Sequence, residues 1–149
     1  MSNQFFEDLA DKKSKIAIAA LAGTALLVVF MTKMAPIVLG QPMDPAGLVN
    51  AILGLPDGSI VGRIGHFALG LIFFPLGYML FPFRHFPGPQ LARGLLYGAI
   101  LAAIAGAVIF PLAGQPMFLG SPKGAMALLM VHLLYTGLIT LIIGKPSAR

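Results

Sequence analysis

Four long apolar runs divide the chain, at about residues 16–32, 61–83, 91–111 and 125–143. Lys or Arg stands near most of their ends, and no run shows the alternation of apolar and polar residues that a barrel strand needs. The shortest run, residues 16–32, reaches roughly 25 Å as an α-helix at about 1.5 Å per residue, just enough to cross a bilayer. Because a helix closes its backbone hydrogen bonds internally, the pattern predicts an all-α fold, a bundle of four transmembrane helices.

Basic residues are distributed unevenly between the two sides of this predicted bundle. The side that holds both termini carries Lys12, Lys13, Lys15, Arg84, Arg93, Lys145 and Arg149, whereas the other side carries Lys33, Arg63 and Lys123. The more basic side of a multi-pass protein faces the cytoplasm, so we predict a bacterial inner-membrane protein with both termini inside. The first run lacks a small-residue cleavage site, and we expect it to be retained as a helix.

The two ends of the chain are expected to lie in the cytoplasm. Residues 1–15 combine aromatic and aliphatic side chains with i,i+4 pairs such as Asp8 and Lys12, a pattern typical of an amphipathic helix at a membrane surface. We predict that this helix anchors the first span. Residues 144–149 are expected to form a short tail after the four-helix domain of residues 16–143.

The connection between the first two runs is unusually apolar for a loop in water. Residues 34–60 form this predicted outer loop, in which the only acidic side chains are Asp44 and Asp57. Asp44 followed by Pro45 is typical of a helix start, and predicts a short helix that extends through Leu53. We expect the segment to lie in the outer interface or to pack against another chain.

A four-residue sequence occurs twice in corresponding places. Gly40-Gln-Pro-Met43 follows the first run and Gly114-Gln-Pro-Met117 follows the third. In each case a histidine, His66 or His132, then appears early in the following run. Two interpretations remain open: two helical hairpins of one ancestral kind, or chance reuse of a turn sequence rich in Gly and Pro. A true repeat would give the two hairpins the same orientation in the membrane.

Small residues mark the helix faces that are expected to pack closely. The third run carries four of them at i+4 spacing, the first carries two, and two in the second lie on the same side of the helix as His66. Such strips let helix backbones approach each other where no water drives association. Pro75 is expected to free a backbone carbonyl and to kink the second span. The predicted packing residues are Gly94, Gly98, Ala102, Gly106, Ala19, Gly23, Gly70 and Gly77.

The composition excludes several classes of protein. Of the 149 residues, 58% are hydrophobic and 10% are charged, whereas ordinary soluble domains have about 45–50% and about 25%. No soluble fold of this size can bury so much apolar surface. The formal charge of +5 arises at the ends of the apolar runs without forming a basic face, so we expect no nucleic-acid partner. The chain holds no cysteine, which excludes thiolate metal sites and cysteine nucleophiles.

Few groups inside the four runs can carry chemistry. No run contains an acidic residue, and no hydrolase triad, zinc-protease or phosphate-loop pattern occurs, so we predict neither enzymatic activity nor a metal site. The ionisable side chains within the membrane are His66 and His132, and His132 heads a polar stripe with Thr136 and Thr140. Because a histidine inside a membrane is costly, its presence there favours a functional role.

Two inward histidines in a four-helix bundle favour a cofactor, haem b or a chlorin, between the second and fourth helices. The candidate binding residues are His66, His132, Arg63 and Thr136, with Arg63 placed to pair with a propionate. Counted from the helix ends, the two histidines differ in height by roughly 9 Å at about 1.5 Å per residue. Ligation by one histidine is therefore geometrically easier than ligation of one iron by both.

The histidine-bearing segments resemble those of a known group of proteins. Gly65-His-Phe-Ala-Leu-Gly70 and Val131-His-Leu-Leu-Tyr-Thr-Gly137 look like segments of small bacterial four-span membrane proteins of unknown function, the YagU-like and related families. The resemblance extends over most of residues 16–143. It implies a four-span fold and a membrane location, and it supplies no activity.

Three functions agree with these patterns. The leading prediction is a non-catalytic accessory or structural subunit of a larger membrane complex, because the outer loop is apolar and small-residue strips are plentiful. The first alternative is a haem- or pigment-binding redox protein that uses His66 or His132. The second is a small-solute channel or carrier, whose path would be lined by the two histidines and by Thr24, Thr136 and Thr140. The expected partners are the lipid bilayer and other membrane subunits or further copies of the chain.

Overall fold

Helices make up almost all of the described chain, and the predicted all-α bundle is confirmed. The computed structural model describes residues 2–146, which form helices and turns and no strand. Three of the elements labelled η are π-helical turns, and η4 is a 3₁₀ helix. In chain order the elements are α1 (Ser2–Val29), η1 (Phe30–Met34), α2 (Ala35–Leu39), α3 (Pro45–Ile52), α4 (Ile60–Ala68), η2 (Leu69–Phe73), α5 (Phe74–Leu80), α6 (Pro82–His85), α7 (Gln90–Ile104), η3 (Ala105–Ile109), α8 (Phe110–Leu112), η4 (Met117–Gly120) and α9 (Pro122–Ile143).

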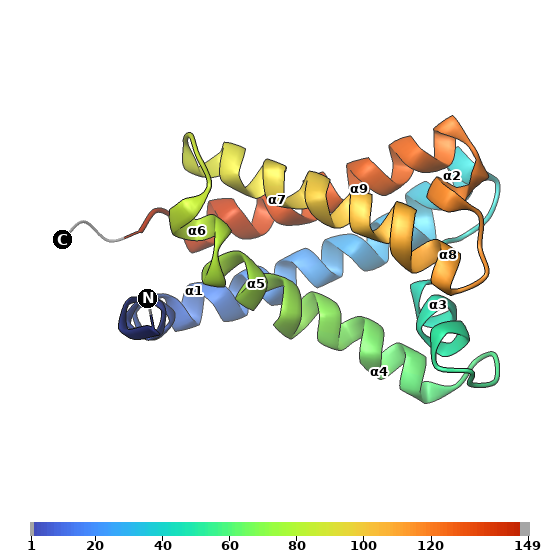
Figure 1. Cartoon of the computed structure of the whole chain (residues 1–149), viewed down its shortest axis with the longest axis horizontal. Helices are drawn as coiled ribbons and strands as arrows, with labels where there is room; N and C mark the ends of the chain where they lie inside the picture. The colour runs from blue at the N-terminus through green and yellow to red at the C-terminus, as the bar shows by residue number, and fades with distance from the viewer. Residues whose placement is uncertain (1, 147–149) are drawn as a thin grey trace.

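These elements join into four helices that are long and apolar enough to cross a membrane. Among the described residues they cover Gln4–Leu39, Ile60–His85, Gln90–Leu112 and Pro122–Ile143. The last three agree with the predicted runs to within a few residues, whereas the first begins far earlier and ends later than predicted. The predicted surface helix of residues 1–15 is therefore continuous with α1, although its first turns bend away from the rest of α1 (Figure 1).

The beginning of α1 and the end of α9 lie at the same end of the bundle (Figure 1). We call this the terminal end and the opposite one the α3 end. Toward the α3 end, α4 diverges from the other spans, and α3 lies in the opening (Figure 1). Arg149 and the rest of residues 147–149, predicted as part of the tail, lie outside the described residues.

Three of the four spans contain a π-turn directly before a proline. In each, the residue before the proline donates its N–H to the carbonyl five positions back: Ala35 to Phe30, Phe74 to Leu69 and Phe110 to Ala105. Proline has no N–H and clashes with the carbonyl four positions earlier, and the wider turn makes room for it. The disturbance predicted at Pro75 takes this form, and it recurs at Pro36 and Pro111.

The central helix is α9, which packs against both α1 and α7. Glycines on α7 let the two backbones approach closely. A Cβ atom added at Gly94 would lie 2.0 Å from Thr140 Oγ1, and one added at Gly98 would lie 2.2 Å from Thr136 Oγ1. Since real Cβ atoms are not found at such distances, larger residues at these two positions would push α7 away from α9.

The other predicted packing residues lie mostly in the interior. A Cβ at Gly23 would lie 2.6 Å from the Tyr135 ring, and one at Gly77 would lie 2.5 Å from Tyr97 Oη. Gly77 is half-buried. Apart from Gly77, every predicted packing residue is buried, namely Ala19, Gly23, Gly70, Gly94, Gly98, Ala102 and Gly106.

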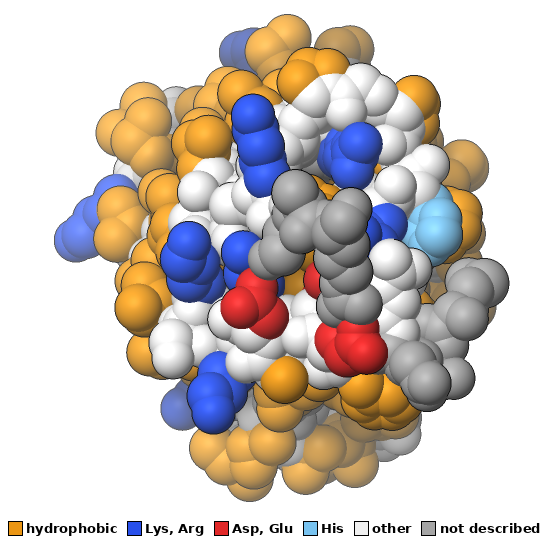
Figure 2. All heavy atoms as spheres, turned by 90° about the vertical axis from the view of Figure 1, so that its left-hand side faces the viewer, with side chains coloured by type: hydrophobic (Ala, Val, Ile, Leu, Met, Phe, Trp, Pro, Cys, Tyr) orange, Lys and Arg blue, Asp and Glu red, His pale blue; other side chains and the backbone are white. Residues whose placement is uncertain are grey.

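A buried ion pair ties the start of α1 to the end of the second span. Arg84 donates through Nε to Asp8 Oδ2 and through Nη2 to Asp8 Oδ1, the latter at 2.6 Å, and Asp8 is only 3% exposed. The predicted pairing of Asp8 with Lys12 is wrong, because Lys12 pairs with Asp11 at 3.4 Å. The sequence places Asp8 and Arg84 far apart, and folding of the second span brings them together. Figure 2 shows basic side chains around acidic ones at this end.

The predicted outer loop, residues 34–60, is largely helical. The first span continues through α2, and α3 begins after Asp44, whose carboxylate accepts from Gly47 N at 2.9 Å. The short helix predicted after Asp44 is thus confirmed. Tight packing fixes α3 on α4, since a Cβ at Gly62 would lie 2.3 Å from Ala46 O.

Both copies of the repeated Gly-Gln-Pro-Met sequence end a span in the same way. Gly40 and Gly114 adopt the left-handed conformation, with φ of 77° and 73°. This conformation is easy for glycine and strained for other residues. After the turn the two copies differ, because one leads into α3 and the other into η4. The shared turn agrees with either interpretation of the repeat.

Candidate functional site

An interior cavity of about 150 Å³ lies beside α3. Residues from all four spans and from α3 line it, and most of them are aliphatic or aromatic. Both intramembrane histidines are among them, His66 from α4 and His132 from α9. The structure thus brings together the two residues that the sequence singled out, despite their different distances from the helix ends.

His132 presents an unused hydrogen-bond acceptor. Its Nδ1 lies 2.8 Å from Leu128 O, and a carbonyl oxygen can only accept, so Nδ1 carries the proton. A charged imidazolium would be poorly solvated among apolar side chains. The neutral ring therefore has a lone pair on Nε2, to which no residue in the described part of the chain donates. The ring lies near Phe74, with the ring centroids 6.5 Å apart.

His66 also has a nitrogen without a partner. Its Nε2 is buried, and within residues 2–146 it has no hydrogen-bond partner. A buried polar atom without a partner costs free energy unless another molecule supplies the hydrogen bond. The two imidazoles therefore give the cavity hydrogen-bonding capacity that the chain itself does not use.

All three π-turns border this cavity. Met31 from η1, Leu69 from η2, and Ala105 and Ile109 from η3 are part of its lining. π-Turns are rare within α-helices and occur frequently at functional sites. The fourth span, α9, contributes His132 to the lining from a helix with no π-turn.

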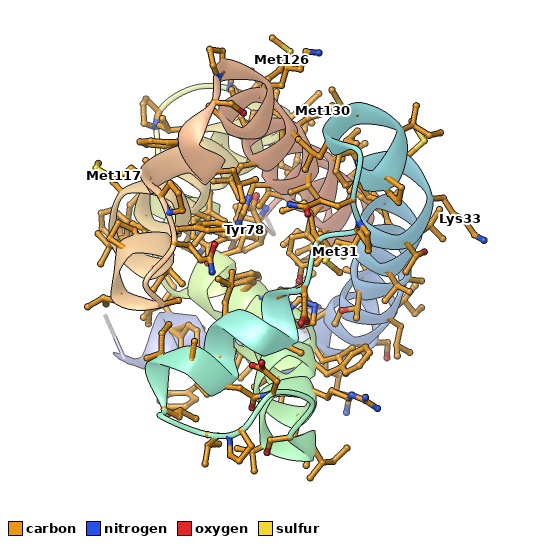
Figure 3. All side chains as sticks on the ribbon, turned by 90° about the vertical axis from the view of Figure 1, so that its right-hand side faces the viewer. Met31, Lys33, Tyr78, Met117, Met126 and Met130 are labelled. Carbon is orange, nitrogen blue, oxygen red and sulfur yellow. The ribbon has the colours of Figure 1, made fainter. Side chains whose placement is uncertain are left out.

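A second, more polar hollow of about 350 Å³ opens near the α3 end. Both acidic residues of the outer segment and both glutamines of the repeated sequence line it: Asp44, Asp57, Gln41 and Gln115. Met43, Pro45, Leu48 and Phe110 line both this hollow and the cavity, so they form a partition between the two. Figure 3, which views the α3 end, shows Met31 toward the middle of the bundle and Lys33 pointing outward at its rim.

A tyrosine in the cavity lining satisfies a backbone carbonyl of the second span. Tyr135 lines the cavity, and its hydroxyl donates to Gly70 O at 2.5 Å. That carbonyl has no helical donor, because Phe74 N–H bonds to Leu69 O and Pro75 has no N–H. The phenol therefore satisfies the carbonyl that the proline frees.

The other two tyrosines lie in the interior as well. Tyr97 donates to Phe74 O at 3.2 Å, and Tyr78 is fully buried. Figure 3 shows Tyr78 toward the middle of the bundle. The sequence analysis missed this role of the tyrosines. Pro75 could have indicated this role, because the backbone carbonyl that it frees within the membrane needs a donor from a neighbouring helix.

Two of the predicted cofactor-binding residues do not line the cavity. Arg63 is exposed on α4, and Thr136 is buried against α7, where its Oγ1 donates to His132 O at 2.8 Å. In the part of the chain that the structure describes, no group of three or more His, Cys, Asp or Glu residues is placed to hold a metal ion. An engineered apolar cavity of about 150 Å³ accommodates benzene, so a porphyrin would require the surrounding helices to separate.

Comparisons of this chain with protein-family models, with curated proteins and with solved structures find no match. The resemblance to the YagU-like proteins stays a prediction that rests on residues 65–70 and 131–137. Inference about function therefore starts from the cavity, its two histidines and the elements around it.

Proposed function

We propose that this chain is a non-catalytic membrane protein that binds a small, largely apolar molecule in the cavity lined by His66 and His132. The observation that carries the proposal is an apolar cavity in the spanning region with two imidazole nitrogens that have no hydrogen-bond partner among the described residues. Apolar hollows with a few well-placed polar groups are the usual form of small-molecule sites. Ionisable residues inside membrane spans usually serve a function, and the surrounding π-turns add to that support.

Binding of 4-fluorotoluene to the detergent-purified protein tests this proposal by fluorine NMR. We expect saturable binding to the wild-type chain. Ala105→Leu fills part of the cavity and is expected to weaken binding at least about tenfold, since each added methylene takes space from the probe. Ala103→Leu is the matched control, because Ala103 is exposed on the same span and does not line the cavity. Absence of saturable binding, or equal binding by both variants, would contradict the proposal.

A haem or chlorin is the alternative occupant, favoured by the presence of both histidines on one cavity. Binding of such a macrocycle would require the spans to move apart, and it would give the protein a visible absorption band. The visible absorption spectrum of the protein purified from its native membrane, recorded with and without dithionite, tests this alternative. A colourless sample would count against it.

An accessory role in a larger membrane complex is a second candidate function, supported by the exposed face of α7. Only 22% of the apolar window in each of the second and third spans is buried within the chain. Ala103 and Ala107 are exposed on the third span at i+4 spacing, and Ala99, one turn before them, is half-buried, a strip that suits close approach by another helix. Isolation from the native membrane in mild detergent is expected to yield a stoichiometric protein partner or a homo-oligomer. A free monomer would contradict this role.

A further inference from the structure

The unused nitrogens of the cavity specify the chemical group that a ligand should carry. Leu128 O fixes the proton of His132 on Nδ1, so Nε2 of this cavity-lining residue is left as an acceptor for a ligand. A ligand without a donor leaves this acceptor unpaired. A ligand with a donor gains a hydrogen bond in surroundings where neither lipid nor a described side chain offers one.

A hydroxyl group fits these surroundings better than other donors do. An ammonium group would bring a charge among apolar side chains, which is costly, and a carboxylate has no donor. A hydroxyl is neutral and donates to His132 Nε2. A hydroxyl also accepts, so a hydroxyl group can pair with the buried Nε2 of His66 whether or not that nitrogen carries a proton.

The size and lining of the cavity favour an aromatic ring as the rest of the ligand. The Phe74 ring lies near the rings of both His132 and Tyr135, with centroids 6.5 Å and 5.9 Å away. A volume of about 150 Å³ matches that of an engineered cavity, also about 150 Å³, that takes up benzene. Aromatic rings also pack favourably against one another at such separations.

We infer that the cavity selects a phenol, a small ring with a hydroxyl group, over a ring of the same shape without one. The inference rests on the proposed function and adds the chemical class of the ligand. It places the hydroxyl at His132 Nε2 and the ring among the aromatic and aliphatic lining.

The test compares 4-fluorophenol with 4-fluorotoluene, which differ by a hydroxyl in place of a methyl group. Both are titrated into the detergent-purified full chain by fluorine NMR, and each dissociation constant is corrected for partition into protein-free micelles. We expect the wild-type chain to bind the phenol about tenfold more tightly. His132→Phe keeps a ring but removes the acceptor, and is expected to abolish the preference while 4-fluorotoluene still binds.

His85→Phe is the matched control, because His85 is exposed at the terminal end and does not line the cavity. It should keep the tenfold preference. A measurement on the wild-type chain covers the case in which His132→Phe does not fold. In nitrogen NMR of the imidazoles, the Nε2 signal of His132 should start as that of an unprotonated nitrogen and shift when 4-fluorophenol is added.

The outcomes separate this inference from the proposed function. Equal affinity of the wild-type chain for the two probes, or a preference that survives in folded His132→Phe, overturns the choice of a phenol and leaves a binding cavity. A protonated Nε2 in the unliganded protein overturns it as well. Failure of both probes to bind overturns the proposed function and this inference together.

Discussion

A single hydroxyl group compensates for the proline in the middle of the second span. Pro75 and the π-turn before it leave Gly70 O without a helical donor, and Tyr135 on α9 provides one from a different span. Inside a membrane no water can take over this role. The contact therefore couples the backbone irregularity of the second span to the central helix.

Tyr135→Phe is expected to lower the free energy of unfolding by about 1–3 kcal/mol, because it leaves a buried carbonyl unpaired while keeping the ring. Reversible unfolding in mixed micelles with increasing denaturing detergent would measure the change. Tyr97→Phe is the control, because its acceptor Phe74 O lies at the first turn of α5 and keeps a helical donor. An equal decrease in the free energy of unfolding in the two variants would show that the bond to Gly70 O matters no more than an ordinary hydrogen bond.

At the scale of elements, the small-residue face of α7 is well predicted by the sequence, although the sequence did not indicate that α9 would pack against it. Small residues every four positions lie on one helix face whatever the surroundings, so their spacing alone predicts a closely packed strip. In the structure, Gly94 and Gly98 bring α7 against Thr140 and Thr136.

Gly98→Ala is expected to destabilise the bundle by about 1–3 kcal/mol, because the added methyl group would have to push apart two packed backbones. Gly137→Ala on α9 is the matched control, since its nearest neighbour atom would lie 3.6 Å away, an ordinary contact. That variant should be neutral or slightly stabilising, because alanine favours the helix over glycine. Unfolding in mixed micelles would compare the two, and similar stability would contradict the expected crowding at Gly98.

The contact between Asp8 and Arg84 gives a second test at this scale. Asp8→Asn removes the carboxylate charge and leaves a partly buried guanidinium without its counter-ion, at an expected cost of about 1–3 kcal/mol. Adding Arg84→Gln to the same chain should restore part of the loss, because neither charge then remains. Thermal unfolding of both variants in detergent would measure this. Additive losses would mean that the two side chains are not coupled.

Several features could not be predicted, because they depend on how distant segments meet. The spacing of residues did not indicate that Asp8 would choose Arg84 over the nearby Lys12. The sequence predicted that His66 and His132 share a site between the second and fourth helices, but their different depths argued against it, and it did not indicate that α3 would line the cavity. Asp44 and Pro45 were enough to predict the start of α3, but the sequence did not predict that α3 would pack against Gly62.

At the scale of the whole molecule, the start of α1 and the end of α9 lie at the same end of the bundle (Figure 1). A thiol reagent that cannot cross the membrane should therefore reach the two ends of the bundle from opposite sides. The native chain has no cysteine, so a single introduced thiol reports one position. In intact bacterial cells, a membrane-impermeant maleimide is expected to label Asp57→Cys and to spare Lys145→Cys, which should react only after lysis, because we propose that the basic end faces the cytoplasm. Labelling of Lys145→Cys in intact cells would reverse the proposed orientation.

The three widened turns before Pro36, Pro75 and Pro111 have a mechanical consequence. We expect these turns to make the cavity wall more deformable than the closely packed contact between α7 and α9, because their hydrogen bonds depart from the α-helical pattern. A ligand of the proposed site would then enter or leave by bending these turns, without separation of α7 from α9. We expect rapid exchange of guests and tolerance of modest differences in their width.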